Sequence, residues 1–181
     1  MNGGINYHQK IKRRYIGIIG KSLNRIKPEN IMRVYVASSW KNKYQPMVVD
    51  ALRSAEIDVY DFRHPEEGDN GFHWSEIDKN WQRWKPEQYI EHLKHPIAEN
   101  GFKKDMDALN SCDICVLVMP CGKSAHLEFG YNLGKGRPSA ILLLEPCGPE
   151  LMYKMSSRIF TKVDDLVWWI LQHENRLVEA E

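Results

Sequence analysis

The chain alternates between short, continuous apolar runs and longer segments in which apolar residues recur every three or four positions. Runs that are apolar on both sides are typical of strands buried on both faces of a parallel sheet, and the recurring pattern is typical of helices that cover such a sheet. The pattern therefore predicts strands at 31–37, 57–62, 113–118 and 139–144, with a brief fifth strand at 158–160.

The predicted helices lie between these strands and after the last of them. Ser38 and Ser39 can cap a helix that follows the first strand, and Ser124 can cap the helix that follows the third. Proline suits the first position of a helix, so Pro86 and Pro96 each begin one. Besides the helix that follows the first strand, helices are predicted at 86–93, 96–111, 124–134 and 163–178. In two of them we expect these side chains to face inward: Phe102, Met106, Leu109, Leu127, Tyr131 and Leu133.

Strands that alternate with helices predict βαβ units with right-handed crossovers. We therefore expect an α/β three-layer sandwich, Rossmann- or flavodoxin-like, with four or five parallel strands in the order 2-1-3-4-5. In such a sheet, ligands bind beyond the carboxyl ends of the first and third strands. Ser38, Ser39 and Trp40 follow the first strand, and the turn 120–128 follows the third. Both groups are therefore expected at one crevice.

Residues 63–86 form an unusually long connection that mixes turn residues with large aromatic side chains. Connections of this length in a compact domain are usually functional, and Trp74 is a candidate to stack on a base. The alternative is that the aromatic residues form a small core of their own. We divide the chain into a basic N-terminal extension, 1–29, and a single α/β domain, 30–181, in which 63–86 is an aromatic flap.

The net charge of +1 predicts no general attraction to nucleic acid or to membranes. Residues 1–30 nevertheless hold seven lysines and arginines against one acid, and such an arm could touch phosphate or an acidic partner. The sequence has no apolar stretch long enough to span a bilayer and begins without a secretory signal. We expect a cytoplasmic protein, with a transit-like peptide around 15–19 left open as an alternative.

The four cysteines are expected to be reduced thiols, because the chain shows no export signal. Cys112 and Cys115 have the C-x-x-C spacing of some zinc and redox sites. Cys115, however, lies inside a predicted buried strand, where a thiol behaves as a small apolar side chain. We therefore expect neither a metal site nor a cofactor.

Glu128 is the candidate for covalent chemistry. It lies about one turn into the helix after the third strand, on a surface that should be mostly apolar. The start of that helix offers free N–H groups and a partial positive charge. Glu128 is either a solvated first-turn acid that favours the helix dipole or a carboxylate held at a ligand crevice as a nucleophile.

Three stretches resemble a known family when taken in order: 34–40 (VYVASSW), 105–116 (DMDALNSCDICV) and 124–131 (SAHLEFGY), the last followed by 134–138 (GKGRP). They are similar to the opening strand, the acidic helix with its central strand, and the Glu-x-Gly helix of the nucleoside 2-deoxyribosyltransferase-like superfamily. That superfamily includes nucleoside 5'-monophosphate N-glycosidases and is distantly similar to TIR domains. The resemblance covers roughly residues 31–145.

The resemblance implies a role for particular residues. Glu128 matches the nucleophile that attacks the anomeric carbon of the sugar, and Asp105 matches the acid that binds or protonates the leaving base. Tyr35 matches the tyrosine that positions the nucleophile, and Trp40 matches an aromatic residue of the base pocket. Ser124 lies where the monophosphate glycosidases hold a 5'-phosphate. A homo-oligomer is also implied, because relatives often complete the pocket with a neighbouring subunit.

The sequence departs from the family before the glutamate. Transferases that act on free deoxynucleosides carry an extra acid there, whereas this chain has Gly122, Lys123 and Ser124. Lys123 and a helix N-terminus suit an anion, so this segment favours a phosphate-bearing substrate.

The position of Asp105 is only partly consistent with its implied role. Helix rise places it about 10 Å before Cys112, which is mid-height on the sheet, and Asp107 and Asp113 are nearby competitors. The expected function is cleavage or transfer at the N-glycosidic bond of a small nucleotide or nucleoside. The alternatives are a TIR-like NAD glycohydrolase and a nucleotide-sensing module without turnover.

Overall fold

The computed structural model describes residues 32–179, and in that range five strands form one parallel sheet in the order β2-β1-β3-β4-β5. The strands are β1 (Arg33–Ala37), β2 (Asp58–Tyr60), β3 (Ile114–Val118), β4 (Ser139–Leu142) and β5 (Arg158–Phe160). The predicted fold class and strand order are confirmed. The predicted extension, 1–29, lies outside the described residues.

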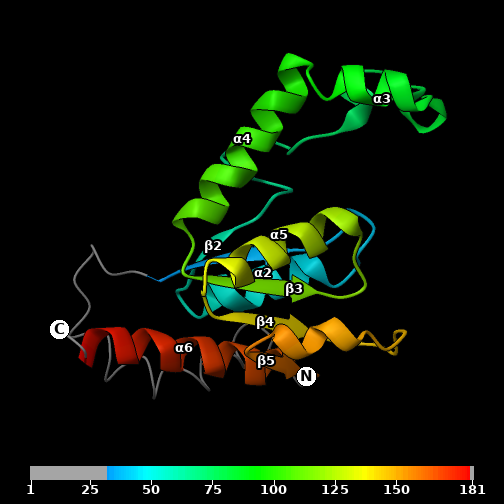
Figure 1. Cartoon of the computed structure of the whole chain (residues 1–181). Coiled ribbons are helices and arrows are strands. Elements are labelled where there is room, and N and C mark those ends of the chain that lie inside the picture. The colour runs from blue at the N-terminus through cyan, green and yellow to red at the C-terminus, as the bar shows by residue number, and fades with distance from the viewer. Residues whose placement is uncertain (1–31, 180–181) are drawn as a thin grey trace, which may run out of the picture.

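The described range holds five α-helices, of which α3 lies away from the sheet at the far end of α4 (Figure 1). They are α2 (Gln45–Ser54), α3 (Pro86–His92), α4 (Pro96–Ser111), α5 (Lys123–Gly134) and α6 (Val163–Glu179). Helices α2 and α6 cover one face of the sheet, and α5 with the C-terminal end of α4 covers the other. None of the helices in the described residues is long and apolar enough to cross a membrane.

Strand β3 lies at the centre of the sheet, between β1 and β4, and all five of its side chains are therefore buried. Its residues alternate between the two faces: Val116 packs with the core on the α2 and α6 side, and Cys115 and Leu117 pack with the core on the α5 side. In β1, Tyr35 points to the α5 side as well. The two cores thus hold the carboxyl ends of β1 and β3 next to each other.

Ser38 and Ser39 do not cap a helix, contrary to the prediction. Helix α2 begins at Gln45 after Tyr44, and residues 38–44 form a loop. The Ser38 hydroxyl donates to the Val118 carbonyl at 2.8 Å, and the Asn42 amide donates to the same oxygen at 3.0 Å. These bonds tie the end of β1 to the end of β3, which explains why Ser38 is buried.

Helix α5 turns a different face to the sheet than predicted. Its N-cap is Gly122, not Ser124, and its buried side chains are Ala125, Phe129 and Asn132. Leu127 is 75% exposed and Tyr131 is 38% exposed. The prediction that these two residues point inward is therefore wrong: Ser124, Leu127, Glu128 and Tyr131 share one helical face, three and four residues apart, and this face borders a cavity.

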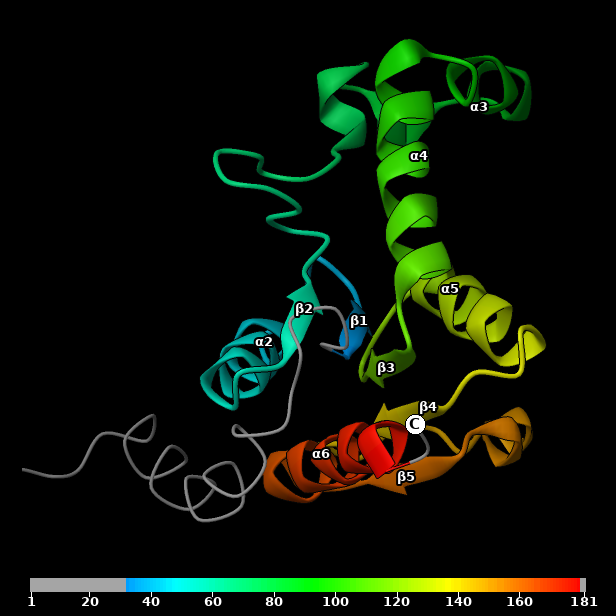
Figure 2. The ribbon, with the colours of Figure 1, turned by 90° about the vertical axis from the view of Figure 1, so that its left-hand side faces the viewer.

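Helix α4 is an arm. Its C-terminal end packs on the sheet through Ala108 and Leu109, whereas its N-terminal part rises away from the sheet and carries α3 at its far end (Figures 1 and 2). Phe102, predicted to face inward, is 66% exposed because the arm has left the sheet at that height. The arm forms the second wall of the cavity.

Candidate active site

A cavity of about 680 Å³ lies between α4 and α5, and we call it the main cavity. Glu128 and Ser124 line it from α5, and Asp105 lines it from α4. Its remaining walls are mostly apolar and come from the arm, from α3 and from the flap, residues 63–86. The expected nucleophile and the expected acid therefore share one enclosure.

Glu128 is mostly buried in this cavity. Burial, together with the negative charge of Asp105, raises the pKa of Glu128 from 4.5 to about 8. The neighbouring Tyr35 hydroxyl partly offsets that rise. Near neutral pH, Glu128 is therefore mostly protonated, unlike a solvated first-turn acid.

Tyr35 is fully buried in β1, and its hydroxyl lies near enough to Glu128 to lower the pKa of that carboxyl group, although it forms no hydrogen bond of standard geometry in the described structure. Burial, followed by the charges of Glu128 and Asp105, raises the pKa of Tyr35 well above its usual value. The hydroxyl therefore stays protonated and is free to donate. A buried donor without a partner is costly in an inert core, so its presence beside Glu128 is consistent with a functional site.

Asp105 accepts a hydrogen bond of 2.9 Å from the Tyr60 hydroxyl. Burial raises the pKa of Asp105, and the bond from Tyr60 opposes the rise. Tyr60 itself stacks on Tyr35 with 5.1 Å between ring centroids, because the two tyrosines are register partners in β2 and β1. Tyr60 was not among the residues predicted from the sequence. Its position at the end of the second strand, next to the first strand with Tyr35, could have indicated that it lies near the site.

The competing acids on the same segment face elsewhere. The Asp107 carboxylate pairs with Lys103 at 2.7 Å on the exposed side of α4. The Asp113 carboxylate accepts a 2.7 Å bond from the Arg33 backbone N–H, at the start of β1. Of these three acids, Asp105 lines the main cavity, and its mid-height position is explained because the cavity runs alongside α4 rather than above the sheet.

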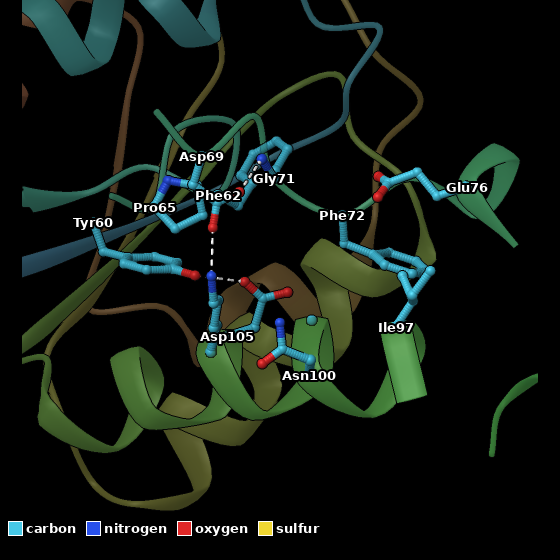
Figure 3. Close-up of a pocket in the computed structure, with 12 residues that line it drawn as sticks. Tyr60, Phe62, Pro65, Asp69, Gly71, Phe72, Glu76, Ile97, Asn100 and Asp105 are labelled. Atoms are coloured by element: carbon cyan, nitrogen blue, oxygen red, sulfur yellow. Dashed lines mark hydrogen bonds and ion pairs between the residues drawn. The ribbon is translucent and has the colours of Figure 1, made fainter. Parts of the chain in front are cut away.

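A second, smaller hollow of about 120 Å³ adjoins Asp105, and we call it the side cavity. Figure 3 shows Asp105 and Asn100 pointing into it from α4, with Asp69 and Phe72 of the flap opposite. The Lys104 ammonium pairs with the Asp69 carboxylate at 2.5 Å and so ties the flap to the arm. Phe72, Gly101 and Asp105 line both cavities, so the two adjoin there.

Trp74 of the flap lines the main cavity and also belongs to an aromatic cluster. Its ring packs edge-on against Phe72 at 4.7 Å and against Trp84 at 5.6 Å. The flap is organised around these rings and two short 3-10 turns, Trp74–Glu76 and Trp81–Arg83. A base-stacking role for Trp74 stays a prediction.

No protein-family model matches the sequence, and no curated protein matches it. Among solved structures, the chain is similar to a 2-deoxyribosyltransferase from the psychrotolerant bacterium Bacillus psychrosaccharolyticus. The two are 17% identical, and the match covers 75% of this chain and 90% of that one with a TM-score of 0.52. The chain has a nucleoside deoxyribosyltransferase-like fold.

Within this deoxyribosyltransferase-like fold, several predicted binding residues lie outside the two cavities described. Trp40 packs on His73 of the flap at 4.1 Å and on Phe62 at 5.3 Å between ring centroids. The Ser39 hydroxyl accepts a bond from the Lys41 backbone N–H at the surface. The predicted binding residues that line neither cavity are Ser38, Ser39, Trp40, Gly122 and Lys123, whereas Ser124 and Trp74 line the main cavity.

The attachment of the flap to this fold can be tested at Gly71. Its φ of +71° is left-handed, and an added Cβ would lie 2.3 Å from the Phe62 carbonyl oxygen and 3.0 Å from the Trp40 ring. Gly68 has a φ of +80° but nothing within 4 Å of its Cβ position, so it is a matched control. We expect Gly68→Ala to cost about 1 kcal/mol and Gly71→Ala to cost at least about 2 kcal/mol more. Urea denaturation followed by tryptophan fluorescence measures both, and equal losses would contradict the packing described.

Proposed function

We propose that this protein cleaves the N-glycosidic bond of a nucleoside or nucleotide and passes the sugar to water or to a second base. The observation that carries this proposal is the pairing of Glu128 and Asp105 in the main cavity, close enough that the charge of Asp105 raises the pKa of Glu128. Two carboxyl groups in different environments are suited to the roles of nucleophile and acid. The deoxyribosyltransferase-like fold supports the same reaction class.

In the proposed first step, the Glu128 carboxylate attacks the anomeric carbon while the bond from that carbon to the base breaks. The bonding electrons pass to the base nitrogen, and Asp105 supplies the proton that neutralises the leaving base. A coupled carboxyl pair favours the state with one proton between its members. In the free protein the raised pKa of Glu128 keeps that proton on Glu128. The step requires the proton on Asp105, so we propose that substrate binding moves it there.

Tyr35 and Tyr60 are proposed to position the two acids. The free Tyr35 hydroxyl can donate to Glu128 and so favour its ionised form, while Tyr60 already donates to Asp105 at 2.9 Å. In the second step, water or another base attacks the sugar carbon and releases Glu128. Hydrolysis and transfer thus share the covalent intermediate and differ in the acceptor.

The charge of the main cavity favours a nucleoside over a phosphate-bearing substrate. In the described residues it is lined by Glu99, Asp105 and Glu128 and by no lysine or arginine. Lys123, which suggested a phosphate site from the sequence, is exposed and lies outside this lining. Anions would therefore be repelled at close range, which weighs against nucleotides and against NAD.

A homo-oligomer remains a proposal. The arm and α5 expose large apolar side chains beside the main cavity, including Phe102 and Leu127. A second copy that packed here would bury this surface and narrow the mouth of the cavity. Sedimentation velocity at several protein concentrations measures the association.

The proposed reaction is tested by incubating the protein with 2'-deoxynucleosides, their 5'-monophosphates and NAD, and by measuring released base chromatographically. We expect free base from deoxynucleosides, and exchange when a second base is added. Release of nicotinamide would favour the NAD glycohydrolase instead. Binding without release, unaltered in Glu128→Ala, would favour the non-catalytic sensing module.

A further inference from the structure

We propose that the outer part of the main cavity binds an aromatic group carried on the leaving base, so that the preferred substrate is a nucleoside whose base bears a bulky, uncharged aromatic substituent. This inference rests on the proposed function, since it takes Glu128 and Asp105 as the place of the sugar and of the bond that breaks. It concerns the residues of the cavity that the proposed reaction does not use.

The length of the cavity is the first argument. Its lining on α4 runs from Leu109 through Asp105 to Ala98, a rise of about 16 Å along the helix. Drug-sized ligands fill cavities of roughly 300–1,000 Å³, and the main cavity, at about 680 Å³, is in the upper half of that range. A sugar at Glu128 with an unsubstituted base at Asp105 occupies only the end near the sheet.

The chemistry of the outer part is the second argument. Beyond Asp105, the walls are the rings of Phe72, Trp74, Tyr89 and Phe102, with Leu93 beside them. Aromatic faces bind flat aromatic groups through offset or edge-on contacts in addition to the area they bury. The absence of lysine and arginine from the described lining excludes an anionic group as the natural occupant.

The exposure of these side chains is the third argument. Tyr89 is 48% exposed, Leu93 is 43% exposed and Phe102 is 66% exposed, although each lines the cavity. They belong to neither of the two hydrophobic cores. The apolar wall and the carboxyl groups of Glu128 and Asp105 line the same cavity. A ligand bound at Glu128 and Asp105 can therefore extend to the apolar wall.

The test compares the binding of two free bases, adenine and N6-benzyladenine, to the full chain by isothermal titration calorimetry. We expect N6-benzyladenine to bind at least about tenfold more tightly, which corresponds to about 1.4 kcal/mol. In Tyr89→Ala and in Leu93→Ala, the ratio of the two affinities should fall to about threefold or less. Both residues are exposed at the surface, so these variants are expected to fold normally.

Trp168→Ala is the matched control, because Trp168 is 50% exposed on α6, across the sheet from the cavity, and its variant should keep the full ratio. Equal binding of the two bases, or a ratio unchanged in Tyr89→Ala and Leu93→Ala, would overturn the inference. So would a dimer that dissociates in Tyr89→Ala while the bases bind alike, since a second copy would then occupy the wall. Turnover of 2'-deoxyadenosine is measured separately: its absence would refute the proposed function even if the preference for N6-benzyladenine were found.

Discussion

Replacing Glu128 by glutamine should lower the rate of base release from a 2'-deoxynucleoside by at least about 10³-fold. Glutamine has nearly the shape of glutamate but cannot form the ester bond to the sugar, and removal of an enzyme nucleophile commonly has effects of this size or larger. Base release measured under single-turnover conditions isolates the first step. In the wild type, intact-mass spectrometry after an acid quench should show the protein with one added deoxyribosyl group.

The control for this experiment is Glu91→Gln. The Glu91 carboxylate is 74% exposed, pairs with Lys94 at 3.1 Å on the surface and does not line the main cavity. Its replacement should leave the rate unchanged. Full activity in Glu128→Gln, with no added mass on the wild type, would remove Glu128 from the mechanism.

The stability of the protein should fall as pH rises from about 4.5 to about 8. Glu128 has a pKa of about 8 when folded and of 4.5 as its ordinary value, so between these limits the folded state binds more protons than the unfolded state. Each rise in pH through that window therefore favours unfolding. Since the cavity is open to solvent, the free energy of unfolding should fall by on the order of 3 kcal/mol, which is less than the full pKa shift of Glu128 would give.

The pH dependence is measured by urea denaturation at intervals from pH 4.5 to pH 9, on the wild type and on Glu128→Gln. Most of the slope should disappear in the variant, and a smaller part of the same sign should remain, because burial also raises the pKa of Asp105. The carboxyl groups of Asp69, Asp78 and Glu145 have lowered pKa values, so they change stability only at more acidic pH. Parallel curves for the two proteins would show that Glu128 is solvated.

The strands and their order could be predicted because burial on both sides leaves a strong signal in the sequence. The run at 114–118 has five buried side chains, and its direction and neighbours follow from βαβ chirality. The starts of helices were predicted less well. Ser38 resembled an N-cap, but its hydroxyl binds the Val118 carbonyl, a partner 80 positions away in the chain that local pattern does not reveal.

The site was predicted in part. Glu128 and Asp105 line one cavity, and Tyr35 lies buried beside Glu128 without lining it; the roles of all three stay predictions. The face of α5 with Leu127 and Tyr131 was mistaken for a core face, because the wall of a ligand cavity and the surface of a core have the same apolar periodicity. The predicted place of Trp40 depended on loop geometry; its ring packs on His73 of the flap, is 41% exposed and lines neither cavity.

The way α4 is held has a mechanical consequence. The arm is about 24 Å long. Its C-terminal end enters the core at Ala108 and Leu109, and next to that end Asp69 and Tyr60 hold Lys104 and Asp105. A pivot of about 10° at the anchored end would displace the far end by about 4 Å, by simple leverage over that length. The width of the cavity mouth is therefore independent of the position of Asp105: the mouth can widen for a bulky ligand, while Asp105, close to the pivot, hardly moves.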